Sequence, residues 1–251
     1  MSSRFSLEGK VALVTGSTTG IGAAIAQALA EAGADVVCHG RGDAERTVAA
    51  VRDAGGRSFA VKADLAERSS HAGLIEAAIR EFGKLDILVN NAGLIRRAAA
   101  EQHSEEDWDT LLAVNLSAVF RLSQLAGRHM LERKSGKIVN IASLLSFQGG
   151  VRVPAYAASK GGVSQLTKAL ANEWAARRVN VNAIAPGYIA TDNTSQLRDD
   201  PERSRQILER IPAGRWGDAS DIAGAAVFLS APASDYVHGH VLVVDGGWLS
   251  R

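Results

Sequence analysis

The sequence predicts an α/β fold in which helices cover both faces of one parallel sheet. Short apolar segments rich in β-branched residues alternate along the whole chain with longer segments of helical spacing, the pattern of consecutive βαβ units. The apolar segments contain few polar residues, which is typical of strands buried on both faces. A glycine-rich turn also joins the first apolar segment to the first helical one, as in many doubly wound sheets.

Each element follows from its own residues. Residues 10–15 (KVALVT) are short and β-rich, whereas residues 20–32 place Ala, Ile and Leu at helical spacing until Gly33 ends the helix. The same alternation predicts seven strands, at 10–15, 35–39, 58–63, 85–90, 137–141, 180–184 and 241–244. Helices are expected at 20–32, 43–54, 68–82, 105–133, 155–177 and 219–230.

One segment interrupts this alternation. Residues 186–217 are long and polar, with one short helix expected at 201–210, and loops of this length are usually lids or binding segments. No Pro/Ser-rich linker divides the chain. We therefore expect residues 1–251 to form a single domain with a substrate lid at about 186–217.

Composition excludes several classes of protein. The 251 residues carry 28 Lys+Arg and 27 Asp+Glu, without the basic excess of nucleic-acid or anionic-membrane binders. The single cysteine, Cys38, cannot form an internal disulfide, and no Cys/His cluster has the spacing of a metal site. No apolar run approaches the ~20 residues of a membrane span, and the first residues lack the apolar core of a signal peptide. We expect a cytoplasmic protein without a metal, a nucleic-acid partner or a membrane partner.

Glycine is over-represented, and its placement is informative. The chain has 25 glycines, more than the roughly 7 per cent that is usual. Gly16, Gly20 and Gly22 lie in the turn TGSTTGIG between the first strand and the first helix. Such glycines let the backbone approach a pyrophosphate, which the positive helix N-terminus also attracts. The turn predicts a dinucleotide site, although its spacing is one residue longer than the usual fingerprint.

Together with the segments 90–93 (NNAG), 156–160 (YAASK) and 186–187 (PG) and with Ser143, this turn resembles the short-chain dehydrogenase/reductase family. The resemblance implies a Rossmann-type, seven-stranded doubly wound sheet, a nicotinamide cofactor and a homotetramer. It implies that segment 90–93 stabilises the central sheet, that Asp64 contacts the adenine and that segment 186–191 holds the nicotinamide. The implied cofactor-binding residues are Gly16, Thr18, Thr19, Gly20, Ile21, Gly22, Arg41, Asp64, Leu65, Asn91, Ala92, Gly93, Tyr156, Lys160, Pro186, Gly187, Ile189 and Thr191.

Tyr156 and Lys160 are the first candidate catalytic pair. They are four residues apart on a predicted helix, so their side chains share one face. A free tyrosine has a pKa of about 10, and an adjacent ammonium favours the phenolate and lowers this pKa towards the working range. By resemblance, Tyr156 exchanges the proton with the substrate oxygen, Lys160 also binds the nicotinamide ribose, and Ser143 polarises the carbonyl.

Asn115 is a polar residue within an apolar helical stripe. An unpaired buried amide costs on the order of 1–3 kcal/mol, so this side chain needs a partner. Either the neighbouring backbone satisfies it, or, as the resemblance implies, it belongs to a catalytic tetrad and holds a water near Lys160. The stripe of helix 105–133 consists of Leu111, Ala118, Leu122 and Leu125.

The choice between NAD and NADP stays open. A carboxylate after the second strand binds the ribose hydroxyls of NAD, whereas an arginine accepts the 2′-phosphate of NADP. Arg41 follows Gly40 at this position and favours NADP. However, Thr19 supplies no second basic residue, and Asp43 and Glu45 lie close enough in sequence to reach a ribose.

Four further segments resemble one branch of the family, the KduD-type 2-dehydro-3-deoxy-D-gluconate 5-dehydrogenases and 2-deoxy-D-gluconate 3-dehydrogenases: residues 92–97, 143–156, 185–194 and 210–217. The implied substrate is a deoxy sugar acid, whose carboxylate suits a guanidinium. Candidate contacts are Arg96, Arg97 and Arg152 for the carboxylate and Gln148 and Asn193 for the hydroxyls.

Two other functions remain as alternatives. The first is another reductase of the family, such as a 3-oxoacyl-carrier-protein reductase or a sugar dehydrogenase. The second is a catalytically silent protein that senses a nucleotide. The presence of Asn115, Ser143, Tyr156 and Lys160 together argues against a silent protein, because sensing does not require all four.

Overall fold

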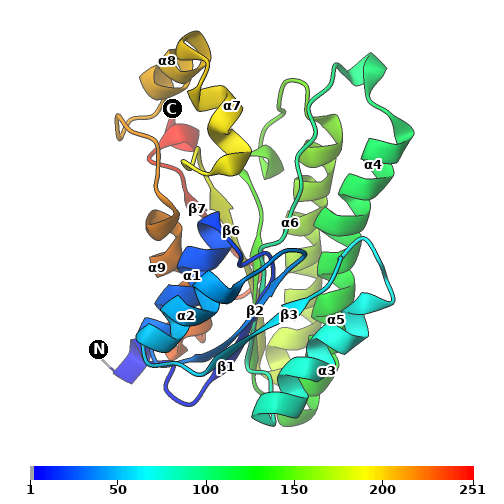
Figure 1. Ribbon diagram of the computed structural model, residues 1–251, viewed down its shortest axis with the longest axis vertical. Helices are drawn as coiled ribbons and strands as arrows, with labels where there is room; N and C mark the ends of the chain where they lie inside the picture. The colour runs from blue at the N-terminus through cyan, green and yellow to red at the C-terminus, as the bar shows by residue number, and fades with distance from the viewer. Residues whose placement is uncertain (1–2) are drawn as a thin grey trace.

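Seven parallel strands form one sheet in the computed structural model, which describes residues 3–251. Their order is β3-β2-β1-β4-β5-β6-β7 (Figure 1), so the predicted doubly wound fold is confirmed. Every strand lies within two residues of its predicted bounds. The strands are β1 Val11–Val14, β2 Asp35–Gly40, β3 Ser58–Lys62, β4 Ile87–Asn90, β5 Gly136–Ile141, β6 Val179–Pro186 and β7 Val241–Val244.

Helices pack on both faces of the sheet, with α1, α2 and α9 on one side and α3, α5 and α6 on the other (Figure 1). The helices are α1 Gly20–Glu31, α2 Glu45–Asp53, α3 Ser70–Phe82, α4 Glu105–Leu112, α5 Ala118–Arg133, α6 Pro154–Trp174, α7 Ser195–Arg198, α8 Pro201–Arg210 and α9 Ala219–Ser230. Short 3₁₀ turns lie at Ser3–Phe5, Ala100–Gln102, Leu144–Ser146, Ala175–Arg177, Asp192–Thr194, Pro232–Ser234 and Trp248–Ser250.

The sheet has a core on each face because successive strand residues point to opposite sides. In β1, Ala12 and Val14 join the core beneath α1 and α9, whereas Val11 and Leu13 join the core beneath α3, α5 and α6. All four β1 residues are buried. This explains why the strands read as continuous apolar runs rather than as alternating ones. None of the helices within residues 3–251 is long and apolar enough to cross a membrane.

The expected single helix at 105–133 is wrong. A π-helical segment at Ala113–Ser117 separates α4 from α5. Asn115 lies in this segment, and its side chain exchanges hydrogen bonds of 2.8 and 2.9 Å with the backbone of Leu94. Widening the helix there lets a buried amide face a neighbouring loop while the apolar residues on either side stay in the core. Similarly, the helix expected at 155–177 ends at Trp174 and continues as a 3₁₀ turn.

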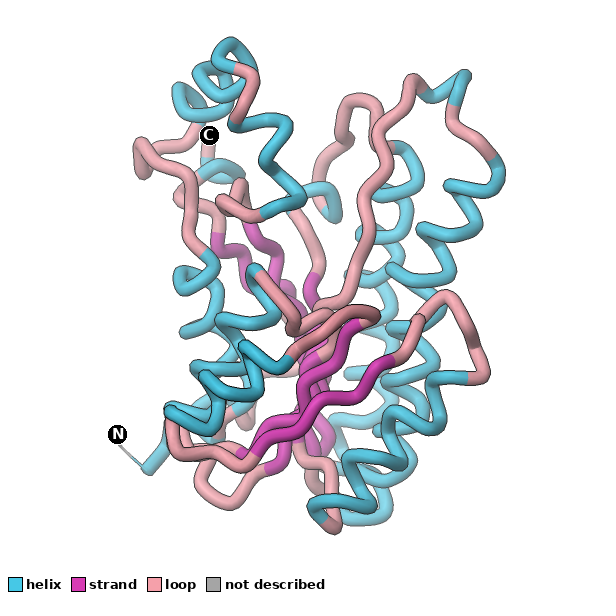
Figure 2. Tube along the Cα trace, in the orientation of Figure 1, coloured by secondary structure: helices cyan, strands magenta, loops and turns pink. Residues whose placement is uncertain are grey.

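The carboxyl ends of the parallel strands share one edge of the sheet. The chain runs outward from β1 to β3 and then crosses back to β4 beside β1, and ligands of such sheets bind where the direction reverses. The segment 186–217 rises above this edge and carries α7 and the expected helix α8, both seen at the top of Figure 1 and, beside loops, in Figure 2. A ligand site is therefore expected at this edge of the sheet, beneath α7.

Candidate active site

A cleft of about 530 Å³ opens at the carboxyl edge of the sheet. Its walls come from the loops that follow β1 to β6. Every residue predicted to bind the cofactor lines this cleft, as do Ser143 and Asn193. Sequence segments that are more than 100 residues apart, such as the glycine turn and the segment that begins at Pro186, thus meet in one site.

The glycine turn forms a narrow cradle after β1. Gly16 has a φ of +63°, and a Cβ atom there would lie 2.7 Å from Ala92 Cα. The Asn91 side chain donates from Nδ2 to the carbonyl oxygens of Thr15 and Gly16, both at 2.9 Å. The loop is therefore held with its backbone close to the cleft at the start of α1, a geometry that fits the pyrophosphate of a dinucleotide.

Asn90 stabilises the centre of the sheet behind this cradle. Its Nδ2 atom donates to Ser123 Oγ at 3.0 Å and to Asn140 Oδ1 at 2.8 Å. Asn140 in turn donates to Thr167 Oγ1 on α6 at 2.9 Å. This buried chain of hydrogen bonds links β4, β5 and α6, the helix that carries Tyr156 and Lys160, in agreement with the structural role expected for segment 90–93.

His39 is a cleft residue that the sequence interpretation missed. It is 2% exposed and lines the cleft from the end of β2. Its Nδ1 accepts a hydrogen bond from the Gly16 backbone N–H, and its Nε2 donates to the Ala63 carbonyl, both at 3.2 Å. Burial lowers the pKa of His39 to about 4, so the ring is neutral at physiological pH. The sequence signal that could have identified it is the polar His39 inside the apolar segment that precedes Gly40 and Arg41.

Arg41 and Asp64 lie at the outer end of the cleft. Arg41 Nη1 is 3.9 Å from Asp64 Oδ2, and their side chains are 64% and 43% exposed. Asp43 does not line the cleft; its Oδ1 accepts from the backbone N–H of Glu45 at the start of α2. The guanidinium is therefore the charged group nearest the end of β2 that is free to meet an anionic ligand.

Tyr156 and Lys160 project from the first turns of α6 into the cleft. Lys160 is 4% exposed, and its Nζ donates to the Ile141 carbonyl at 2.6 Å and lies 5.7 Å from the Tyr156 ring centroid. Burial lowers the pKa of Lys160 to about 8. Burial raises the pKa of Tyr156, while Ser143 and Arg97 act to lower it. The lowering of the tyrosine pKa that the sequence predicted from Lys160 is not seen in this structure, where burial has the largest effect and the groups that oppose it are Ser143 and Arg97.

Asn115 lies behind Tyr156 and Lys160 and does not line the cleft. The backbone of Leu94 satisfies its amide, as the first of the two alternatives expected, and Nδ2 is also 3.3 Å from Ser159 Oγ. A Cβ atom on Gly93 would lie 3.4 Å from Asn115 Oδ1 and 3.7 Å from Lys160 Nζ. Asn115 therefore holds the 93–94 backbone against the base of the site.

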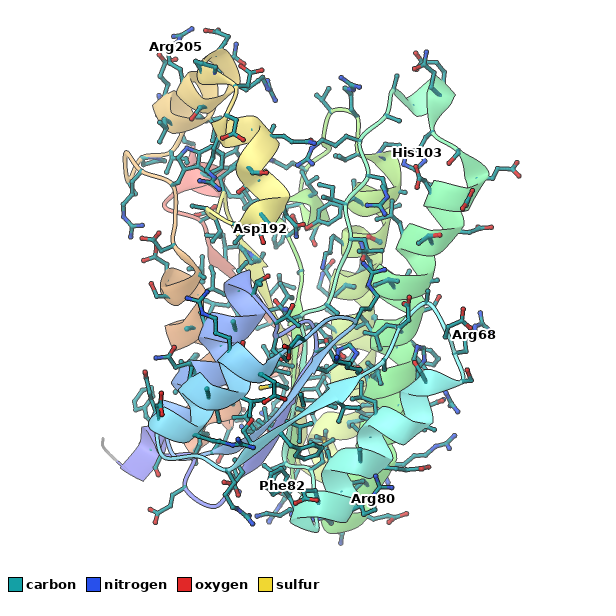
Figure 3. All side chains as sticks on the ribbon, viewed as in Figure 1. Arg68, Arg80, Phe82, His103, Asp192 and Arg205 are labelled. Carbon is teal, nitrogen blue, oxygen red and sulfur yellow. The ribbon has the colours of Figure 1, made fainter. Side chains whose placement is uncertain are left out.

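The predicted substrate residues are placed very differently. Asn193 lines the cleft, next to Asp192, which Figure 3 labels on the lid side. Arg96 is exposed and pairs with Asp107 at 3.5 Å. Gln148 Oε1 accepts from Trp248 Nε1 at 3.4 Å. Arg152 is exposed, with a φ of +63°. Neither Gln148 nor these two arginines line the cleft.

An aromatic cluster anchors the segment 186–217 to the body of the protein. Tyr188 contacts Trp216 edge-to-face at 5.6 Å between ring centroids and Trp248 at 4.6 Å. The Arg210 guanidinium at the end of α8 lies 4.1 Å above the Trp248 ring. These contacts fix both ends of the segment 186–217 against the C-terminal turn. Within residues 3–251, no cluster of His, Cys, Asp or Glu is arranged to hold a metal.

Known proteins are similar to this chain in sequence and in fold. Residues 16–249 match the family described as enoyl-(acyl carrier protein) reductase. The chain is 54% identical to 2-dehydro-3-deoxy-D-gluconate 5-dehydrogenase of Dickeya dadantii over 248 residues, which cover 98% of both chains. It is 56% identical to the enzyme of that name from Bacillus subtilis, over 98% of this chain and 97% of the other.

Solved structures agree over the full length. An Agrobacterium tumefaciens protein assigned as a 2-deoxy-D-gluconate 3-dehydrogenase, crystallised with NADP, superposes with a TM-score of 0.94 at 55% identity and covers 100% of both chains. A gluconate 5-dehydrogenase of Burkholderia cenocepacia, crystallised with NADP and tartrate, gives 0.93 at 42% identity over 99% of this chain and 98% of the other. With the glycine cradle and the Ser143, Tyr156 and Lys160 site in place, the chain belongs to the short-chain dehydrogenase/reductase family.

Proposed function

We propose that this protein is an oxidoreductase that interconverts a secondary alcohol and a ketone on a deoxy sugar acid, with 2-dehydro-3-deoxy-D-gluconate as the first candidate substrate. The observation that carries the proposal is the position of Tyr156 and Lys160, beside Ser143 and next to the glycine cradle. The names of the Dickeya and Bacillus relatives support the substrate, and 2-deoxy-D-gluconate is the second candidate.

Tyr156 is the proposed acid and base. Its raised pKa keeps the phenol protonated at neutral pH, so it can give a proton to the oxygen of a ketone during reduction. The Ser143 hydroxyl, which also lines the cleft, donates to that oxygen and polarises the carbonyl. NADP(H), when bound, supplies the two-electron chemistry by giving or taking a hydride.

Lys160 assists the proton transfer by Tyr156 from a buried position in the site. Its ammonium is buried and has one backbone acceptor, Ile141 O, so it retains N–H groups for a ribose hydroxyl. Its positive charge, 5.7 Å from the Tyr156 ring centroid, favours the phenolate that remains after proton transfer. Asn115 positions the backbone beside this ammonium and is a positioning residue.

NADP is the proposed cofactor. Arg41 lines the outer end of the cleft, where Asp43 and Glu45 do not. The Arg41 guanidinium is well exposed and only loosely paired with Asp64, at 3.9 Å, and can bind a 2′-phosphate in fork geometry. The related Agrobacterium and Burkholderia structures hold NADP.

A homotetramer of cytoplasmic subunits is the proposed assembly. Trp108 of α4 and Phe120 of α5 are 40% and 44% exposed, and aromatic side chains of this kind are enriched at protein interfaces. Light scattering coupled to size exclusion measures the assembly directly. A monomer in solution would contradict this part of the proposal.

The test of function is a pair of reduction assays with 2,5-diketo-3-deoxygluconate. We expect NADPH to be oxidised faster than NADH, and Tyr156→Phe to lower kcat by about 10²- to 10⁴-fold while NADP binding is kept. Assays with a 3-oxoacyl thioester and with neutral sugars test the other reductases of the family. A protein that binds NADP but reduces none of these compounds would instead be a silent nucleotide sensor.

A further inference from the structure

A second cavity, here called the amino-edge cavity, has a volume of about 520 Å³ and lies at the opposite edge of the sheet from the active-site cleft. Its wall comes from the starts of β4, β5 and β6 and from the turns that follow α5, α6 and α9, at the lower edge of the sheet in Figure 1. Within residues 3–251, no residue lines both this cavity and the cleft. The volume suits a small organic molecule, since such sites are typically about 300–1,000 Å³.

The wall of the amino-edge cavity carries an excess of positive charge. Four basic residues line it against two carboxylates, and both carboxylates are already paired. Asp235 accepts from Lys137 Nζ at 2.7 Å. Asp86 accepts from Arg133 Nη2 at 2.9 Å and lies 3.2 Å from Lys84 Nζ. The acidic groups of the wall are therefore not available to neutralise its other cations.

Three cations of the wall, Lys10, Lys134 and Arg178, have no carboxylate within ion-pair distance among residues 3–251. Lys134 and Arg178 end the turns after α5 and α6 with φ values of +51° and +61°, a conformation that favours glycine. Each turn nevertheless places a basic side chain at the cavity. Like charges gathered around one cavity repel one another, and an anion between them relieves this repulsion.

Lys10 and Lys137 show that the cations influence one another. Lys137 is half-buried, and burial lowers its pKa. Asp235 raises this pKa and Lys10 lowers it again, because a second positive charge disfavours the ammonium. The interaction places Lys10 near the buried end of the wall, so the cations surround the cavity rather than one side of it.

Polar groups complete the wall and are held in place by Asn180. Its Nδ2 atom donates to the carbonyl oxygens of Asp235 and Val237, both at 3.0 Å, and lies 3.3 Å from His238 Nε2. An amide nitrogen only donates, so Nε2 accepts and Nδ1 of His238 carries the ring proton. Neither this Nδ1 atom nor Oγ of the buried Ser230 has a partner within residues 3–251. Buried polar atoms without partners are rare and need a group from outside the chain.

We propose that the amino-edge cavity is a second ligand site, which binds a phosphorylated sugar. The three unpaired cations suit the oxygens of a phosphate dianion, and the Arg178 guanidinium can bind two of them at once. Ser230 and His238 supply polar groups for the sugar hydroxyls. A lone phosphate ion would leave these groups unpaired. The inference does not depend on the proposed function, because none of these residues lines the active-site cleft.

The test is calorimetric titration of the full chain saturated with NADP, so that phosphate groups in solution meet a filled cofactor site. The probes are glucose 6-phosphate, glucose and inorganic phosphate. We expect glucose 6-phosphate to bind with one equivalent, more tightly than either of the others. Its affinity should fall as salt is raised, since charges near the surface are screened.

Two variants locate this binding. Lys134→Gly/Arg178→Gly removes two cations at positions whose φ suits glycine, so the fold is kept, and thermal unfolding checks this. We expect the Kd for glucose 6-phosphate to rise about 10- to 100-fold in this double variant. Arg177→Ala removes an exposed neighbour that does not line the cavity, and it should bind like wild type.

Four results would overturn the proposal. They are no heat with millimolar glucose 6-phosphate, equal affinity for glucose and glucose 6-phosphate, inorganic phosphate bound as tightly as glucose 6-phosphate, and unchanged binding in Lys134→Gly/Arg178→Gly. The reductase assays above use other residues, so they succeed or fail separately from this titration.

Discussion

The Nδ1 atom of His39 accepts a hydrogen bond from the backbone N–H of Gly16 at 3.2 Å, so a buried strand residue fixes the first glycine of the cradle. The other ring nitrogen, Nε2, donates to the Ala63 carbonyl, also at 3.2 Å. One neutral imidazole thereby ties the pyrophosphate loop to the end of β3, where Asp64 begins the loop at the outer end of the cleft. Because it touches only the backbone, we regard His39 as a positioning residue.

Substitutions at His39 should weaken cofactor binding more than they slow catalysis. Leucine removes both partners and leaves a buried N–H unpaired, which costs on the order of 1–3 kcal/mol. We expect His39→Leu to raise KM for NADPH by about tenfold or more, with a smaller change in kcat. Asparagine can still accept from Gly16, so His39→Asn is the matched control. Equal KM values in the two variants would show that the Gly16 bond does not position the loop.

The pH dependence of reduction should report the titration of Lys160. Its pKa lies near 8 because burial disfavours the ammonium, so the charge is present below pH 8 and is lost as pH rises through this value. Tyr156 stays protonated over the same range, since burial raises its pKa. We expect kcat/KM for the ketone to fall above about pH 8.

Lys160→Arg provides the control for this profile. The guanidinium keeps its charge at alkaline pH, so the fall near pH 8 should disappear, whatever the absolute rate of the variant. The same shift has a stability consequence with a defined sign. Between about 8 and 10.5 the unfolded chain binds the extra proton, so this group makes the folded state more stable as pH rises. A wild-type profile that stays level to pH 9.5 would contradict the lysine assignment.

Arg41 should determine the preference for NADPH over NADH. A charge-assisted, bidentate contact with a phosphate contributes about 1.5–3 kcal/mol. Arg41→Ala is therefore expected to raise KM for NADPH by roughly 10- to 100-fold and to leave KM for NADH nearly unchanged. Asp64→Asn removes the partner but keeps the guanidinium, and serves as the control. A similar rise for both nucleotides in Arg41→Ala would assign Arg41 to some other contact.

Trp248 should control the opening of the lid. It contacts Tyr188 and Arg210, and one aromatic pair with one cation–π contact contributes about 2 kcal/mol. Losing both in Trp248→Ala should make local opening roughly 30-fold more frequent. Trypsin is expected to cut faster at the arginines of α8, among them Arg205, labelled at the top of Figure 3. Trp248→Phe, which keeps a ring, is the comparison, and equal cleavage rates in wild type and Trp248→Ala would refute the anchoring role.

The sequence was a good guide wherever one physical pattern acts alone. Uninterrupted apolar runs predicted all seven strands within two residues, and the glycine turn predicted the cofactor cleft. The predictions were weaker where the local structure depends on a contact between a side chain and a residue that is distant in the sequence. The π segment at Ala113–Ser117 exists because Asn115 reaches the Leu94 backbone, a contact that helical periodicity does not encode. In the same way, only the fold shows that Arg96 is exposed and paired with Asp107, whereas its neighbour Arg97 is half-buried and donates to the Asn193 carbonyl.

The strand order has a consequence for how such an enzyme can diversify. Thr18, Arg41 and Asp64 come from the β1–β3 stretch, whereas Ser143 and Tyr156 come from the stretch after β4, so the two ends of the cleft are built from different parts of the sheet. Changes that do not touch one another contribute independently. A lineage can therefore exchange its nucleotide without disturbing its choice of sugar acid, and the reverse, so the two selectivities are free to evolve separately.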